Sequence, residues 1–228
     1  MDNNAQLYFL KKNDITLLEE SYRGQAFDLS SNGFSLPNLQ LQMIGQHQVY
    51  NASLAILTLL ILQERKHLYL PNDSIYKGIY SNIWAGRLEL ILENPLIFID
   101  GAHNLQGAEV LASSIERYFP NKKLNLVIGM LSNKDTTGVL NTLIPLCNRV
   151  IFTTPNNNPK AMVAEKLAGQ VSFLGKEIQV VEKLEEAVVL ALETTAADEV
   201  TVFTGSLYLV GDVRHILLNH VNESVIAS

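Results

Sequence analysis

The chain alternates short apolar runs with longer amphipathic segments from Gly86 onward. The runs LIFID, LNLVIGM, VIFTTP, EIQVVE and EVTVFTG are continuously apolar at their centres, and helical periodicity follows each of them, most clearly in LEEAVVLALETTA. Buried strands that alternate with amphipathic helices are typical of a parallel sheet covered on both faces. The pattern therefore predicts an α/β fold with a mostly parallel sheet and helices on both faces.

Local patterns place the elements of this region. LELIL and LIFID flank ENP, which predicts an antiparallel hairpin at the start of the sheet. The helices expected after it cover residues 105–118, about 134–146, 161–170, 184–196 and 206–220.

The first 85 residues follow a different pattern. Residues 1–45 carry short alternating pieces separated by Gly, Asn and Ser, and we interpret them as a few strands and loops. NASLAILTLLILQERKHL and SIYKGIYSNI predict helices, with a turn at Pro71 and Asn72 between them. A hairpin with one or two helices is not a self-sufficient domain. We therefore expect residues 1–85 to be the remainder of a larger domain and residues 86–228 to form a complete one.

Composition and charge exclude several classes of protein. The 228 residues carry a net charge of −6 and no basic stripe, so a nucleic-acid partner is not expected. The longest apolar stretch, LAILTLLIL, is far below the roughly 20 residues of a membrane span. The single cysteine, Cys147, excludes a disulfide within the chain, and the N-terminus has no signal-peptide pattern. A cytoplasmic protein is expected.

The segment FIDGAHN contains the first candidate site. Asp100 ends an apolar strand, and His103 and Asn104 lie at the start of the next helix, where free N–H groups attract anions. An aspartate there suits a pair of ribose hydroxyls, and a histidine with an asparagine suits phosphate oxygens. The alternative is that Asp100 and Asn104 cap the helix and His103 is a surface residue.

Two further strand ends carry polar groups. Ser206 follows the strand VTVF in TGS, where it either caps the next helix or joins a nest of N–H groups that holds a carboxylate or phosphate. LVIGMLSNKD places Ser132, Lys134 and Asp135 after another strand. Because ligands bind outside the carboxyl ends of strands in open α/β sheets, these loops favour a shared site.

Two candidates lie upstream. In GQHQVYNA, His47 and Asn51 share one helix face, and Gln48 or Asn51 can offer a donor and an acceptor to an adenine edge. Arg87 in WAGRLE carries a permanent charge that suits a polyphosphate. The alternatives are a polar helix start without a ligand and a solitary surface arginine. The sequence contains no GxxxxGK[ST], GxGxxG after a strand, HExxH or cysteine pair.

Five motifs in order resemble one family. GQHQVYNA, WAGRLE, DGAHN, LSNKD and TGSLY, between Leu39 and Arg214, resemble folylpolyglutamate synthase and its bifunctional dihydrofolate synthase relatives in the Mur ligase superfamily. That family usually has WPGR and DGAHNP, where this chain has Ala85 and Leu105. Both differences remove a proline that would stiffen a turn, and neither removes a polar group.

The resemblance implies an activity and a domain organisation. It implies ATP-dependent addition of L-glutamate to a folate or to dihydropteroate through an acyl phosphate, with Mg²⁺ on the phosphates. Residues 1–85 would end an ATP-binding Mur ligase central domain, residues 86–228 would form a Rossmann-like C-terminal domain, and the nucleotide would lie between them. The full-length protein would be a monomer. The roles implied are Gln48 and Asn51 near the adenine, His47 at that helix start, Arg87 and His103 near phosphates, Asp100 near the ribose, and Ser206 facing glutamate and folate.

Truncation is the main departure from the family. The family's phosphate loop and its magnesium-binding residues precede the region that matches Met1, so no metal ligand is expected here. We expect the isolated chain to be the C-terminal part of a synthase, without ligase activity. The alternatives are a non-catalytic α/β module that binds a small anion or a protein, and a sister ligase for a cell-wall precursor. GRLE followed by DGAH favours the folate branch.

Overall fold

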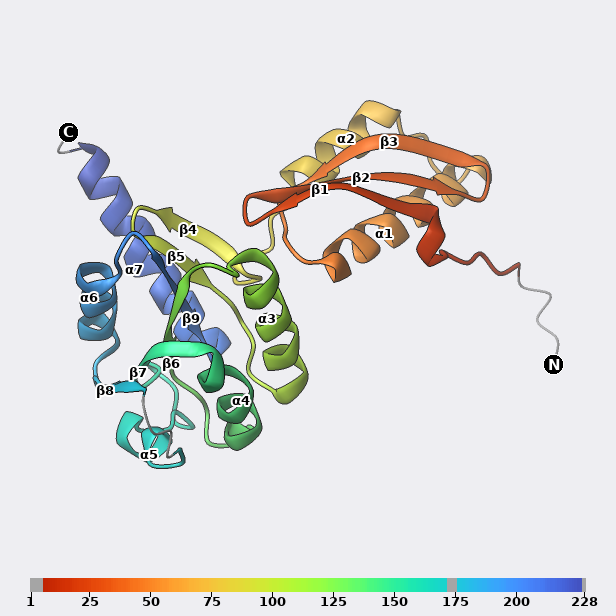
Figure 1. Ribbon diagram of the computed structural model, residues 1–228. Coiled ribbons are helices and arrows are strands. Elements are labelled where there is room, and N and C mark those ends of the chain that lie inside the picture. Colours follow the sequence, from red (N-terminus) through yellow and green to blue (C-terminus); the bar gives the residue numbers. More distant parts are fainter. Residues whose placement is uncertain (1–5, 172–175, 227–228) are drawn as a thin grey trace, which may run out of the picture. The chain divides into compact units, whose positions relative to one another are not determined.

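The computed structural model describes residues 6–171 and 176–226, which divide into two compact units (Figure 1). The first unit is Met1–Trp84 and the second is Ala85–Ser228. Each unit has its own sheet, three-stranded in the first and six-stranded in the second.

The first unit is an antiparallel meander with helices. Asn32 and Gly33 both have positive φ, at 51° and 85°, and form the tight turn between β2 and β3. An Asn-Gly pair favours this turn because both residues tolerate left-handed backbone. The few strands expected in residues 1–45 are three antiparallel strands, one more than a hairpin has. The elements are η1 Lys12–Asp14, β1 Ile15–Ser21, β2 Gly24–Ser31, β3 Phe34–Leu41, α1 Gln46–Glu64 and α2 Asn72–Ser81.

One side of α1 packs on this sheet. Its buried residues recur at helical spacing and meet apolar side chains of β2 and β3. Leu54 and Leu62 are exposed, so the helix is apolar over much of its circumference. Across the described ranges, no helix combines the length and apolarity that crossing a membrane requires. The core of the unit is Phe27, Leu29, Leu36, Leu39, Leu41, Val49, Ala52, Ile56, Leu60 and Ile75.

The second unit is built on a sheet with strand order β4-β5-β9-β6-β7-β8. The β4–β5 hairpin is antiparallel, and every other neighbouring pair is parallel. This confirms the predicted mostly parallel α/β sheet and its opening hairpin. The elements are β4 Glu89–Glu93, β5 Leu96–Ile99, α3 Leu105–Tyr118, β6 Lys123–Ile128, α4 Thr136–Leu143, η2 Ile144–Leu146, β7 Cys147–Phe152, α5 Ala164–Ala168, β8 Glu177–Val180, α6 Leu184–Thr194, β9 Glu199–Thr204 and α7 Leu207–Ile226.

Helices cover both faces of this sheet (Figure 1). Successive side chains of a strand point to opposite faces, so Ile97 and Ile99 pack with α6 and α7. Phe98 points the other way and packs on Phe119, which follows α3, with ring centroids 5.1 Å apart and ring planes tilted by 60°. The continuous apolar runs of the sequence are explained by this burial on two faces.

The segment before α5 differs from the expected helix over 161–170. Only Ala164–Ala168 is helical. Ala161 forms a bridge with Leu131, and the Met162 N–H donates to the Met130 carbonyl at 2.9 Å. Because these residues pair with the loop after β6, they are extended and the helix begins after them.

Burial of Cys147 generates a prediction about thiol reactivity. The side chain is fully buried at the start of β7, and burial raises the pKa of its thiol to about 12. We expect modification by a disulfide reagent at pH 8 to be at least about 100-fold slower in the folded chain than in denaturant, because only a thiolate reacts and local opening must expose it. A Glu165→Cys variant supplies an exposed thiol as the control. Equal rates in folded and denatured protein would contradict the buried position.

Candidate functional site

A cavity of about 410 Å³ lies where loops leave the carboxyl ends of the parallel strands. His103 reaches it from the loop after β5, Lys134 from the loop after β6, Lys160 from the loop after β7, and Ser206 from the loop after β9. The predicted convergence of strand-end loops on one site is therefore observed within the second unit. Tyr208, in the first turn of α7, also lines the cavity.

Backbone contacts hold the loops after β5 and β9 together. The Ala102 carbonyl accepts hydrogen bonds from Gly205 N–H at 2.9 Å and from Thr204 Oγ1 at 3.2 Å. Gly205 has a φ of +105°, and a Cβ there would lie 2.7 Å from the Gly129 carbonyl oxygen. Only glycine fits this position without a shift of the neighbouring loop. The loop that carries His103 and the loop that carries Ser206 are therefore held together by hydrogen bonds to the Ala102 carbonyl.

The loops after β6 and β7 are joined in the same way. Ser132 N–H donates to the Lys160 carbonyl at 2.8 Å, next to the bridge between Leu131 and Ala161. Asn158 Oδ1 accepts from Lys160 N–H at 2.9 Å and closes the turn. The backbone segments that carry Lys134 and Lys160 are thus held against each other.

The His103 ring has a defined tautomer. Its Nδ1 lies 2.8 Å from the Gly101 carbonyl oxygen. A carbonyl can only accept, so Nδ1 carries the proton and the neutral ring has its lone pair on Nε2. The side chain is partly exposed and lines the cavity. This ring can accept a proton or a hydrogen bond from a bound group.

Asp100 joins two backbone segments. Its Oδ2 accepts from Leu88 N–H and its Oδ1 from Ala102 N–H, both at 2.8 Å. Burial raises the pKa of this carboxyl, and the two N–H donors together with the charges of Arg87 and His103 offset part of the rise. Asp100 thus fixes the loop before β4 to the turn after β5. Each oxygen retains a second lone pair that could accept a hydrogen bond from a ribose hydroxyl. That role stays a prediction.

Asn104 and Ser206 cap helices. Asn104 Oδ1 accepts from Gly107 N–H at 2.8 Å at the start of α3. Ser206 Oγ accepts from Tyr208 N–H at 3.2 Å at the start of α7. These contacts match the capping alternative drawn from the sequence. They do not exclude ligand contacts, which stay a prediction for both side chains.

Arg87 is exposed in the loop that Asp100 holds. The Gly86 carbonyl accepts from Gly101 N–H at 2.7 Å, so this loop lies against the turn that carries His103. The structure therefore brings Arg87, Asp100 and His103 together on neighbouring loops of the second unit.

The upstream candidates belong to the first unit. His47 and Asn51 are exposed in the first turns of α1, whereas Gln48 is buried, with 9% of its surface accessible. Gly45, the residue before the helix, has a φ of +107°, and its carbonyl accepts from Gln25 Nε2 at 3.1 Å. The helix start is therefore held in place, and His47 with Asn51 forms its accessible polar face.

Sequence reasoning did not single out several residues that line the cavity, among them Asn158, Lys160 and Tyr208. Asn158 and Lys160 lie in TTPNNNPK, directly after the strand VIF, and Tyr208 follows Ser206. A polar run with a lysine after a buried strand is the same pattern that identified the other loops, so it was available to find Lys160. Tyr208 has no such pattern, because an aromatic residue near a helix start is common in a core.

The cavity suits an anion. Two lysines and a histidine line it, and the described residues around it include no aspartate or glutamate. Among the residues with defined positions, no group of three or more His, Cys, Asp or Glu is placed to hold a metal ion. The described arrangement thus favours a carboxylate or phosphate over a bare cation.

Comparisons with known proteins agree on one family. The family described as Mur ligase, glutamate ligase domain, matches residues 86–207. A dihydrofolate synthase/folylpolyglutamate synthase from Bacillus subtilis is 27% identical over 191 residues, which cover 84% of this chain and 44% of the relative.

Solved structures give the same result. Folylpolyglutamate synthase from Thermotoga maritima has a TM-score of 0.75 and 34% identity, with 90% of this chain and 46% of that chain covered. The enzyme from Mycobacterium tuberculosis, solved with ADP and AMPPCP, has a TM-score of 0.75, 28% identity, and coverage of 90% and 48%. The chain spans about half the length of these relatives.

The two N–H contacts of Asp100 generate a stability prediction. In Asp100→Asn, the amide nitrogen would face either Leu88 N–H or Ala102 N–H, so a buried donor would lose its acceptor. We expect the free energy of unfolding to fall by about 1–3 kcal/mol, measured by urea denaturation at pH 7. Asp198→Asn is the control, because it removes only the exposed salt bridge with Lys123. This variant should change the free energy of unfolding by less than about 0.5 kcal/mol. Equal effects in both variants would argue against a structural role for Asp100.

Proposed function

This chain belongs to the Mur ligase family, and we propose that it takes part in the ATP-dependent addition of L-glutamate to a folate. The acceptor is a tetrahydrofolate carrying glutamate, or dihydropteroate. Similarity to folylpolyglutamate and dihydrofolate synthases supports the reaction. The observation that carries the proposal is the cationic cavity at the strand ends, which His103 of the motif DGAHN and Ser206 of the motif TGSLY both line.

The reaction sets clear physical demands. A carboxylate is a poor electrophile, and ATP, when bound, supplies the phosphoryl group that activates it as an acyl phosphate. The amine of L-glutamate must then be held in line with the activated carbon and must be deprotonated. The groups that line the cavity are assigned to the second demand.

We assign L-glutamate to the cavity. Lysine ammonium groups at its wall neutralise carboxylate charge, and the Nε2 lone pair of His103 is available to accept a proton from the attacking amine. Ser206 presents a hydroxyl at the start of α7, where helix N–H groups also favour an anion. His103 and Ser206 are therefore the proposed catalytic pair.

Nucleotide contacts are proposed for the remaining candidates, with the residues of each unit considered by themselves. Arg87 offers an exposed guanidinium for phosphate oxygens, and Asp100 and Asn104 retain lone pairs for hydroxyl or phosphate-bound groups. The polar start of α1, with His47, Gln48 and Asn51, is proposed for the adenine. Mg²⁺ is proposed to enter with ATP. No step is assigned to it, because the described residues form no metal site of their own.

Turnover by these 228 residues alone is not expected. The sequence has no GxxxxGK[ST] loop to cradle the phosphates of ATP. In a coupled ADP-release assay with ATP, Mg²⁺ and L-glutamate, we expect no activity above background with either tetrahydrofolate or dihydropteroate. ADP release that depends on both folate and L-glutamate would show that the chain supplies the phosphate site itself.

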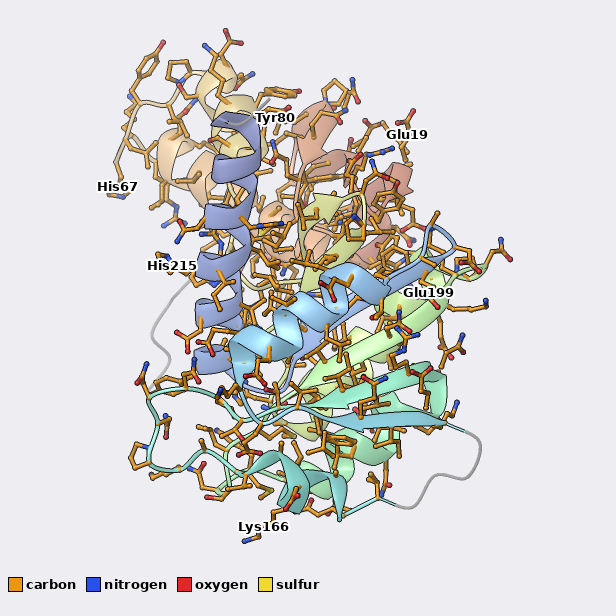
Figure 2. All side chains as sticks on the ribbon, turned by 90° about the vertical axis from the view of Figure 1, so that its left-hand side faces the viewer. Glu19, His67, Tyr80, Lys166, Glu199 and His215 are labelled. Carbon is orange, nitrogen blue, oxygen red and sulfur yellow. The ribbon has the colours of Figure 1, made fainter. Side chains whose placement is uncertain are left out.

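Binding of L-glutamate tests the proposed cavity function directly. We expect the purified chain to bind L-glutamate, and His103→Ala to weaken binding about three- to tenfold through loss of a hydrogen-bonding partner. His215→Ala, at an exposed position on α7, is the control and should bind like the original chain (Figure 2). Ligand-observed NMR titration measures all three proteins. A chain that is folded but binds no L-glutamate would favour the alternative of a module for another anion or a protein.

A further inference from the structure

The loop that carries Arg87 has a strained backbone. Gly86 and Leu88, the residues on either side of Arg87, have positive φ angles of 71° and 43°. A leucine rarely adopts this conformation, which persists only where the surrounding structure holds it. Glycine is needed at the first position, because a Cβ there would lie 2.9 Å from Val210 Cγ1. The Arg87 side chain is exposed, so its direction depends on how firmly this loop is held.

Two carboxylates hold the loop from opposite ends. Asp100, directly after β5, accepts from Leu88 N–H at 2.8 Å. Glu89, the first residue of β4, accepts from Gly86 N–H through its Oε2, also at 2.8 Å. The N–H groups on both sides of Arg87 therefore each end on a carboxylate oxygen. The contact of Glu89 differs from that of Asp100 in one respect, because a second charged residue holds the Glu89 side chain.

That second residue is Arg214 on α7. Its Nε donates to Glu89 Oε1 at 3.0 Å and to Oε2 at 3.2 Å. The two side chains are 38% and 13% accessible, so water and salt screen this pair less than a fully exposed one. Val210 lies one turn earlier on the same side of α7 and packs against Gly86. One side of α7 thus supports the loop directly and through Glu89.

We propose that Glu89 and Arg214 are positioning residues that direct the Arg87 guanidinium toward phosphate oxygens. The inference rests on the proposed function, which gives Arg87 a nucleotide contact, and adds the pair that fixes the direction of that contact. Among the described residues, no carboxylate forms a salt bridge with Arg87. A guanidinium meets phosphate through a planar fork of donors, so affinity depends on its direction as well as its charge.

The charge of Glu89 predicts the opposite effect on anion binding. If Glu89 acted only through its negative charge, removing that charge would strengthen the binding of an anion nearby. Removing a positioning residue weakens binding instead. Glu89→Gln keeps the size of the side chain, but its single oxygen replaces the two that serve Gly86 N–H and Arg214. The sign of the change in affinity therefore separates the two roles.

The test measures the binding of pyrophosphate without metal. It is titrated at fixed ionic strength into the full 228-residue chain and its variants, and binding is followed by NMR at the Gly86 amide, next to Arg87. Anions bound elsewhere on the chain are then not counted. The variants are Glu89→Gln, Arg214→Lys, Arg87→Met, and Glu89→Gln combined with Arg87→Met. Glu116→Gln, at an exposed position on α3, is the control for the loss of one negative charge. Thermal unfolding confirms that each variant is folded.

The expected result is a loss of affinity that runs through Arg87. Glu89→Gln should bind pyrophosphate about three- to tenfold more weakly, and Glu116→Gln should bind no more weakly than the original chain. Arg214→Lys should lose about twofold or more at unchanged net charge, because an ammonium lacks the planar donors of a guanidinium. Arg87→Met should show the largest loss, and adding Glu89→Gln to it should change affinity by less than about twofold.

Three results would overturn the proposal. Affinity in Glu89→Gln that is unchanged or higher would show that Glu89 acts through charge alone or not at all. A further loss on adding Glu89→Gln to Arg87→Met would show that Glu89 does not act through Arg87. A folded original chain without pyrophosphate binding at Gly86 would remove the contact that the pair is proposed to direct. Binding of L-glutamate in the cavity is measured separately, so failure of the pair and failure of the proposed function are distinguishable.

Discussion

Close backbone contact between loops at the carboxyl edge of the sheet is the constraint on which the second unit depends. The Ala102 carbonyl receives donors from Gly205 and Thr204, which joins the ends of two neighbouring strands. Gly205 approaches Gly129 so closely that a Cβ would meet its carbonyl oxygen. Three loops are thereby held at spacings that side chains alone would not fix. Groups placed on such a frame keep their geometry, which a site for a small polar ligand requires.

Two kinds of residue lie at this edge: some hold the loops together, and others are exposed and available to a ligand. Asp100 uses both oxygens on backbone N–H groups, and Asn104 uses its side chain to cap α3. Lys134 and Lys160, by contrast, extend from fixed backbones and have no carboxylate partner among the described residues. In a family whose members share this fold, ligand choice can change at such exposed tips without cost to the core.

The sequence predicted the second unit well because its strands are buried on both faces. A run such as LIFID has no polar alternation, so its place in a parallel sheet is clear from the residues alone. The helix expected over 161–170 was wrong in extent, since Ala161 and Met162 pair with a loop that is distant in sequence. Helical periodicity reports only on local neighbours and does not reveal such pairing.

The site could likewise be predicted where the signal is local, and not where it depends on segments distant in sequence. His103 and Ser206 were found because each follows a strand directly, within motifs that resemble a known family. Lys160 also follows a buried strand but was not singled out, and a bridge to the loop after β6 joins its segment to the cavity. The dual role of Asp100 was also hidden, because the partner at Leu88 comes from a separate segment.

The starts of α3 and α7 lie at the carboxyl edge of the sheet and link stability with ligand chemistry. Asn104 and Ser206 each accept one N–H of the helix that follows, which leaves other N–H groups of the first turn without an intrahelical partner. Those groups and the helix dipoles favour negative charge at the same edge where the two lysines lie. A capping side chain therefore does not compete with an anion for the site. It orients the first turn, and the N–H groups that the cap leaves open are available to the proposed anion.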